Sequence, residues 1–157
     1  MKNKTLAVWL TLVLGPLGLH RRYLLGRFDA LALALPVPTL LGLYGVLRAR
    51  SLGVDDTLSW VLMPLLGFTL AGCALTAIVY GLMPTERWNQ RFNPSALPEA
   101  AAGASNWMTV VGLGAALMLG TTVLMASLAF SIQHYFEYQM EQARSLSQSV
   151  PFRKSAG

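Results

Sequence analysis

Charged residues are scarce in this sequence. They make up 12% of the 157 residues, whereas hydrophobic residues make up 54%, and about a quarter of an ordinary soluble domain is charged. Two stretches, 58–83 and 107–132, contain no Asp, Glu, Lys or Arg. Each is longer than the roughly 20 apolar residues that cross a bilayer as a helix. The scarcity of charge therefore disfavours an ordinary soluble domain and indicates an integral membrane protein.

Cysteine and histidine are also rare, which limits the chemistry expected of the chain. The single cysteine, Cys73, cannot form an intramolecular disulfide, and the two histidines, His20 and His134, follow different apolar blocks. The sequence contains no Gly-rich phosphate loop and no Ser-His-Asp set. Neither long stretch holds the ionisable residues that mark intramembrane catalysis or ion translocation. We therefore expect no enzymatic activity, no cofactor and no metal site.

The basic residues are distributed as in a membrane protein. The net charge is +5, but Lys and Arg occur in small groups between the apolar blocks. Basic residues beside a span set its orientation and contact anionic headgroups. The expected partners are therefore membrane lipids with anionic headgroups, and nucleic acid is not among them. The first groups are Lys2 with Lys4, then Arg21, Arg22 and Arg27, then Arg48 and Arg50.

Residues 57–83 and 107–132 are predicted to form the third and fourth transmembrane helices. In the fourth, Gly112, Ala116 and Gly120 recur every four residues and therefore share one helical face. Small residues at this spacing let another helix approach closely, in the same chain or in a partner. A segment rich in Gly and Ala also produces such a spacing by chance, so the alternative of no special role stays open.

The first two apolar blocks are harder to interpret. Residues 5–19 are short for a crossing and contain a Gly-Pro pair, and residues 30–47 contain two prolines and two glycines. Such segments form either short crossings or broken, re-entrant structures. We predict an all-α, polytopic transmembrane fold of about four spans, in which residues 1–56 form a helical hairpin of two short spans and two long spans follow.

The positions of the two termini depend on how the first two blocks behave. If both blocks cross, or both only dip into the bilayer, the two termini lie on the same side, and only a single crossing would change this. Lys and Arg number seven on the terminal side and five on the other. The excess predicts cytoplasmic termini, in a multi-pass protein of the cell membrane.

Two segments outside the spans have helical character. Residues 84–106 are predicted to contain a short interfacial helix and then a loop, because Trp88 and Phe92 would form one apolar edge of a helix. Residues 133–157 are predicted to extend the fourth helix and to end in a disordered, Ser-rich tail. A narrow apolar stripe on this extension either contacts a partner, lies on headgroups or belongs to a solvated helix end. The stripe consists of Phe136, Met140 and Ala143.

The end of the first apolar block carries a motif. Residues 15–26 resemble the TM2 domain, in which a pattern like G-x-x-G-x-H-R-F-Y-L-G closes the first of two transmembrane helices joined by a short turn. Arg22 stands where that family has Phe, and Leu25 is an additional residue before the last glycine. The resemblance covers about residues 2–56, and it implies a membrane hairpin in a protein of undefined role, often from the bacterial inner membrane. The matching residues are Gly15, Gly18, His20, Arg21, Tyr23, Leu24 and Gly26.

The same segment has a physical interpretation as a contact with lipid headgroups. Basic side chains there would meet phosphate oxygens while an aromatic ring anchors at headgroup depth. The contact is either a specific lipid site or a general membrane anchor. The residues expected at the headgroups are His20, Arg21, Arg22, Tyr23 and Arg27.

Two classes of function remain at this point. The leading hypothesis is a membrane protein that is not an enzyme and that acts through helix packing, self-association, or binding of a partner or lipid. The alternative is a small transporter or channel component, which the proline- and glycine-rich second block and the Thr121-Thr122 pair favour.

Overall fold

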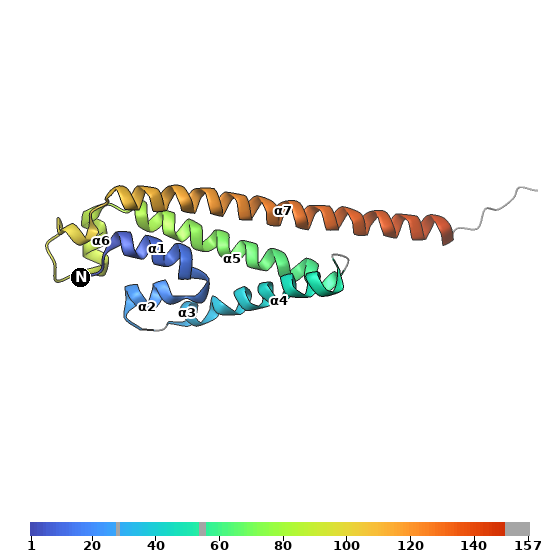
Figure 1. The fold of residues 1–157 in the computed structure, drawn as a ribbon, viewed down its shortest axis with the longest axis horizontal. Helices are drawn as coiled ribbons and strands as arrows, with labels where there is room; N and C mark the ends of the chain where they lie inside the picture. The colour runs from blue at the N-terminus through green and yellow to red at the C-terminus, as the bar shows by residue number, and fades with distance from the viewer. Residues whose placement is uncertain (28, 54–55, 150–157) are drawn as a thin grey trace, which may run out of the picture.

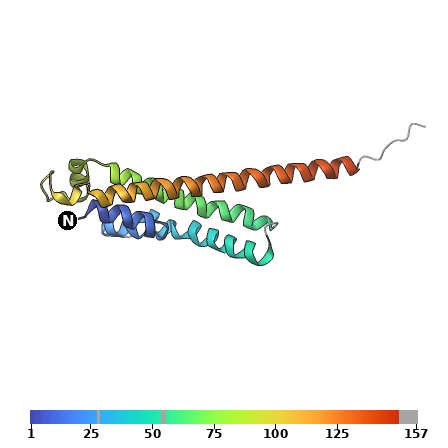
Figure 2. The same ribbon diagram turned by 45° about the horizontal axis from the view of Figure 1, so that its top comes forward.

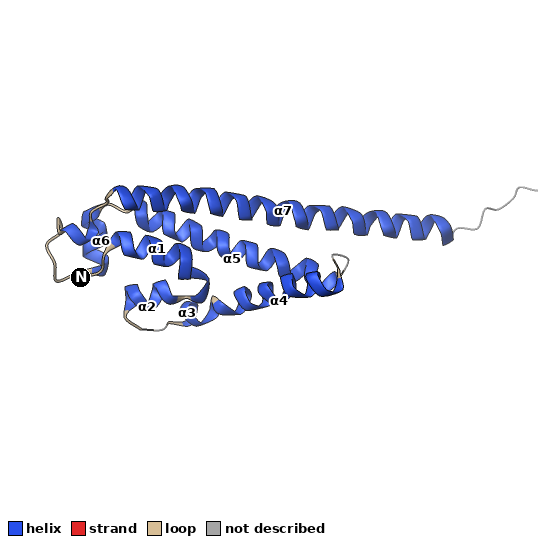
Figure 3. Cartoon of the chain, viewed as in Figure 1, coloured by secondary structure: helices blue, strands red, loops and turns tan. Residues whose placement is uncertain are grey.

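The computed structural model describes residues 1–27, 29–53 and 56–149. Within these residues the protein is 84% helical and has no strand, as Figure 3 shows, so the predicted all-α class is confirmed. Residues 28, 54 and 55 of the predicted hairpin and residues 150–157 of the predicted disordered tail lie outside the described residues.

Three helices are long and apolar enough to cross a membrane. The first joins α3 (Ala30–Ala34) to α4 (Pro36–Leu52), and the others are α5 (Thr57–Leu82) and α7 (Trp107–Ser149). The three run in alternating directions, so the N-terminus and the end of α7 lie at opposite ends of the elongated molecule (Figures 1 and 2). The predicted count of four spans is not confirmed within the described residues, because the first apolar block is shorter than these helices.

The first apolar block forms a helical hairpin that turns back halfway along the bundle. It consists of α1 (Lys4–Leu14), the 3-10 turn η1 (Gly15–Leu17) and α2 (Leu19–Leu25). Gly18 reverses the chain with a φ of 74°, a left-handed conformation that suits glycine. Lys4–Leu17 is only about 21 Å long at 1.5 Å per residue. The block is therefore a broken helical hairpin and not one continuous helix, and its position in a membrane stays a prediction.

Prolines in the next helix provide the surface on which this reversal packs. Pro36 has no N–H, so the Ala32 carbonyl lacks its helical partner and the helix is interrupted between α3 and α4. Gly18 packs at that carbonyl, because a Cβ on Gly18 would lie 2.1 Å from the Ala32 oxygen. The Thr39 hydroxyl group lies 2.9 Å from the Pro16 carbonyl oxygen and fixes the turn beside α4.

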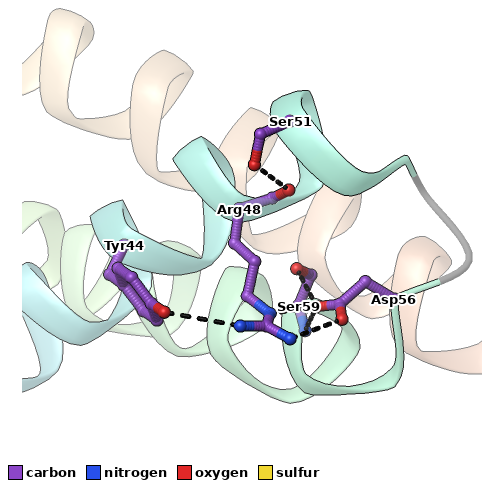
Figure 4. A network of polar contacts seen from close by, with 5 residues as sticks. All are labelled: Tyr44, Arg48, Ser51, Asp56 and Ser59. Atoms are coloured by element: carbon purple, nitrogen blue, oxygen red, sulfur yellow. Dashed lines mark hydrogen bonds and ion pairs between the residues drawn. The ribbon is translucent and has the colours of Figure 1, made fainter.

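Glycines also bring α4 and α5 together. A Cβ on Gly42 would lie 2.4 Å from Leu66 Cβ, and one on Gly45 would lie 2.5 Å from Leu62 Cβ. The connection between the two helices is closed by the Arg48–Asp56 ion pair, which Figure 4 shows with its neighbours. The glycines that made the second block look broken are therefore packing residues of a continuous α4.

The predicted small-residue face of the last span packs within the chain. A Cβ on Gly112 would lie 3.0 Å from Val8 of α1, and one on Gly120 would lie 2.8 Å from Ala74 of α5. Ala116 between them is fully buried. A hydrogen bond from Trp9 Nε1 to the Met108 carbonyl, 3.2 Å long, adds to the contact between α1 and α7.

The short helix α6 (Thr85–Phe92) covers the end of the bundle at which the N-terminus lies (Figure 1). Its apolar edge, Trp88 and Phe92, is buried against α1 and α2. The location of this helix at a membrane interface stays a prediction. Trp88 Nε1 donates a 3.0 Å hydrogen bond to the Lys2 carbonyl, and the buried Lys4 ammonium group donates one of 2.9 Å to the Met83 carbonyl. A loop and the 3-10 turn η2 (Ala101–Gly103) then lead to α7.

The helix α7 continues well past the other helices (Figures 1 and 2). At the level where α5 begins, His134 stacks on Trp60 with ring centroids 4.2 Å apart. We call residues 133–149 the stem. The predicted extension of the fourth helix is therefore continuous with the span, and the two form a helix of 43 residues.

Candidate functional site

A cleft of about 440 Å³ lies beside the helical hairpin of α1, η1 and α2. Residues of α2, α3, α4 and α5 line it, so it exists because the hairpin turns back and leaves space along α5. Most of its lining is apolar, and its basic side chains all come from α2. The lining residues are His20, Arg21, Leu31, Leu35, Pro38, Leu65, Phe68, Thr69, Gly72, Cys73 and Thr76.

His20 is held inside the protein. Its side chain is only 3% exposed, and Nδ1 has no hydrogen-bond partner among the described residues. A Cβ on Gly15 would lie 3.1 Å from Cys73 Sγ and 3.7 Å from His20 Nδ1, so Gly15 leaves room for both groups. An unpaired buried nitrogen is costly, because burial removes its water without replacing the hydrogen bond. This atom is the first sign that the cleft receives a polar group.

Arg21 forms an ion pair with Asp29 across the mouth of the hairpin. Arg21 Nε lies 2.9 Å and 3.1 Å from the two carboxylate oxygens, and Nη2 contacts Oδ2. Asp29 also caps α3 by accepting a 3.0 Å hydrogen bond from the Ala32 amide. None of the hydrogen bonds within the described part of the chain uses Nη1, so the guanidinium group retains donors that can reach a ligand.

The rest of the cleft is open to the outside and apolar apart from Thr69 and Thr76, whose hydroxyl groups donate to carbonyls of their own helix. Leu31 and Phe68 are exposed at its edge, and Leu35 and Pro38 continue the apolar surface along the hairpin side of α3 and α4. A basic, hydrogen-bonding part thus lies next to an apolar groove. This combination suits an amphiphilic molecule with a polar head and an apolar tail.

The residues predicted to contact headgroups separate into two groups. His20 and Arg21 lie in the cleft, whereas Arg22 and Arg27 are exposed outside it. Tyr23 is half-buried, and its hydroxyl oxygen accepts a 2.8 Å hydrogen bond from the Asn3 amide. The headgroup contacts themselves stay a prediction.

Sequence reasoning missed the acidic member of the site, Asp29. It follows Arg21 by eight residues, a spacing at which no helical pattern links two side chains. Asp29 directly precedes an apolar helix, which is the position of an N-cap, and that signal could have located it. Its partner could not have been identified, because the pairing depends on the reversal at Gly18.

No three His, Cys, Asp or Glu residues come together as metal ligands in the described ranges. A second groove, of about 340 Å³, lies between α5 and α7 and is also touched by α4. Its lining is apolar apart from the hydroxyls of Thr122 and Ser127. Because it offers no charged group, it is a weaker candidate for a specific site than the cleft.

Comparisons with family models, curated proteins and solved structures find no match for this chain. The resemblance to the TM2 domain therefore rests on residues 15–26 alone and stays a prediction.

Proposed function

We propose that this protein is an integral membrane protein that binds a phospholipid in the cleft beside its re-entrant hairpin. The lipid phosphate contacts Arg21 and His20, and an acyl chain lies along the apolar groove. The single observation that carries the proposal is that the buried, unpartnered Nδ1 of His20 and the partly exposed guanidinium group of Arg21 lie beside an apolar cleft that opens outward.

The arrangement in the bilayer follows from the three long helices. From Trp60 to Tyr80, α5 covers about 30 Å, the thickness of the hydrocarbon layer. Cys73 and its neighbour His20 then lie about 10 Å below the level of Tyr80, counted along α5. Ionisable groups at such depth are expensive and usually functional. Three crossings put the N-terminus and the stem on opposite sides, in place of the expected shared cytoplasmic side.

The charge near the cleft favours an anionic head. Residues 20–29 contain three arginines and one aspartate. Asp29 neutralises Arg21 only in part, because the guanidinium fork can bind a carboxylate and a phosphate through different nitrogens. The positive rim attracts anionic lipids, and the apolar groove adds about 0.8 kcal/mol for each buried CH₂ group.

Lipid retention measured by native mass spectrometry tests this proposal. Purified protein in mild detergent receives phosphatidylglycerol or phosphatidylcholine, and Arg21→Gln is compared with Arg22→Gln. We expect Arg21→Gln to reduce retained phosphatidylglycerol roughly tenfold, as expected for a lost charge-assisted hydrogen bond. Arg22→Gln removes the same charge from the same helix outside the cleft, and we expect it to change retention by less than about twofold.

A double variant separates binding from folding. Arg21→Gln alone leaves Asp29 without its partner and so destabilises the hairpin, whereas Arg21→Gln with Asp29→Asn restores a neutral, hydrogen-bonding pair. We expect the double variant to fold and still to lose the lipid. Unchanged phosphatidylglycerol retention in the double variant, or equal losses in the Arg21 and Arg22 variants, would overturn the proposal.

The re-entrant hairpin also supports the second candidate, a transporter or channel component. Irregular backbone at membrane depth is tolerated where it lines a cavity. This candidate predicts solute flux in liposomes above that of empty vesicles. Flux that Arg21→Gln abolishes would favour it over simple lipid binding. The bacterial inner membrane as location rests on the TM2 resemblance alone.

A further inference from the structure

Beyond His134, which stacks on Trp60, the stem is a single helix that no other part of the described chain covers. Its remaining 15 residues protrude about 22 Å past the bundle at 1.5 Å per residue (Figure 1). An isolated helix of this length is marginal in water. Yet Phe136 and Leu146 are 59% and 67% exposed on it. A second helix that covered these side chains would explain why the stem is helical and why it carries apolar residues.

Nine exposed positions of α7, seven of them apolar, follow a heptad spacing. They alternate in steps of three and four residues, the pattern of two helices packed along each other. The stripe begins within the uncharged span and continues into the stem without a change of register. All its members are exposed, on the face of α7 opposite the buried Ala116, Ser127 and His134. The members are Met118, Thr122, Met125, Ala129, Ile132, Phe136, Gln139, Ala143 and Leu146.

The positions of the charged side chains indicate which kind of helix covers this stripe. All three charged side chains of the stem, Glu137, Glu141 and Arg144, lie away from the stripe and from the positions that flank it. When a second copy of the same helix packs on the stripe, no like charges therefore face each other. A partner helix with charged side chains in the contact would find no opposite charge on the stripe. Copies inserted with the same orientation are also parallel, so identical residues meet at the same depth.

We propose that α7 pairs with α7 of a second copy of this chain, in parallel and in register, through the stripe from Met118 to Leu146. Phe136 and Leu146 form apolar layers in the stem. Gln139 meets Gln139 of the other copy, and a buried polar pair of this kind fixes register in parallel helix pairs. The pairing is independent of lipid binding, because the cleft contains no residue of α7.

Site-specific crosslinking in native membranes tests the pairing. In a full-length Cys73→Ala background, Gln139→Cys places a thiol on the stripe and Glu141→Cys places one on the opposite face of the same helix turn. A short bis-maleimide is expected to link Gln139→Cys into dimers roughly tenfold more efficiently than Glu141→Cys, since only stripe positions approach their counterparts. Equal yields at the two sites would overturn the proposal, and so would a product with the mass of a different protein.

A matched pair of aromatic substitutions adds a second readout. Phe136→Lys puts a like charge into the paired face, whereas Tyr138→Lys puts the same charge on an exposed aromatic position outside it. We expect Phe136→Lys to reduce the Gln139→Cys dimer roughly tenfold and Tyr138→Lys to change it by less than about twofold. If the yield of the dimer fell in neither variant, the result would contradict the pairing. Lipid retention should stay unchanged in both, which keeps this test distinct from that of the cleft.

Discussion

Lys2 and Lys4 have structural roles that their positions in the sequence do not reveal. The sequence suggested charges that orient the first span, yet the Lys2 ammonium group binds the Leu24 carbonyl and that of Lys4 binds the Met83 carbonyl. These carbonyls end α2 and α5, where a cation is favoured by the helix dipole. The sequence predicts that such basic residues lie beside the end of a span. It does not predict which helix end each lysine contacts.

Asp56 is the residue whose titration the structure describes most directly. Its carboxylate accepts hydrogen bonds from Arg48 Nε at 2.7 Å and from the Ser59 hydroxyl at 2.7 Å (Figure 4). The bond from Arg48 is the largest cause, followed by that from Ser59, of a pKa well below the ordinary value for this carboxyl group. The charged carboxylate is thus the form that stabilises the connection between α4 and α5.

We expect Asp56→Asn to lower the melting temperature at neutral pH, because the variant loses the ion pair with Arg48. A depressed pKa stabilises the protein above the unfolded value near 4, and this contribution is lost as the pH falls through the folded value. The difference between wild type and variant should therefore be full at pH 7 and shrink below about pH 4. Thermal melts in detergent measure it, with the exposed Glu99→Gln as the control. A difference that grew on acidification would contradict the assignment.

At the scale of the elements, uninterrupted hydrophobicity was the reliable signal. It predicted α5 and the uncharged part of α7. A helix pairs the backbone N–H and C=O groups of a 26-residue uncharged stretch within the stretch itself. The first block was ambiguous, since Gly15, Pro16 and Gly18 allow either a kinked crossing or a reversal. The choice depends on contacts with α3 and α6 that lie far away in the sequence, so local patterns could not make it.

Two glycines in this region provide a test of the reversal. Gly18 and Gly26 both have a φ above 70°, but only Gly18 has a neighbour at the position of an added Cβ. Gly18→Ala should lower the free energy of unfolding by roughly 2–4 kcal/mol, through backbone strain and the collision with Ala32. Gly26→Ala should lower it by about 1 kcal/mol, through strain alone. Denaturation in mixed micelles gives both values, and equal losses would show that Gly18 does not pack against α3.

At the scale of the whole molecule, the number of crossings decides the topology. The sequence predicted four spans and termini on one side of the membrane. A single crossing by the first two blocks would instead place the termini on opposite sides. The structure has a short helical hairpin followed by one helix long enough to span a membrane, an arrangement compatible with that case. The cleft exists because the first block forms a short hairpin beside α5. The sequence does not predict that arrangement, so only some residues of the site could be named from it.

Accessibility labelling distinguishes the two topologies. A tag at Met1 and a cysteine in Arg27→Cys should react from the same side of the membrane in the Cys73→Ala background. The stem cysteine of Glu141→Cys should react from the other side, because three crossings separate it from the N-terminus. A tag at Met1 that shared its side with Glu141→Cys, opposite to Arg27→Cys, would instead support four crossings. Protease protection of the tag in sealed vesicles gives an independent check.

The contacts of the N-terminal segment also determine the order in which the protein is assembled. Lys2 and Lys4 are synthesised before their partners Asn93 and Met83, which follow 91 and 79 residues later. The surface that receives α1 does not exist until α5, α6 and the start of α7 have left the ribosome. The native packing of the hairpin therefore forms only after these helices have been made, and it completes the bundle.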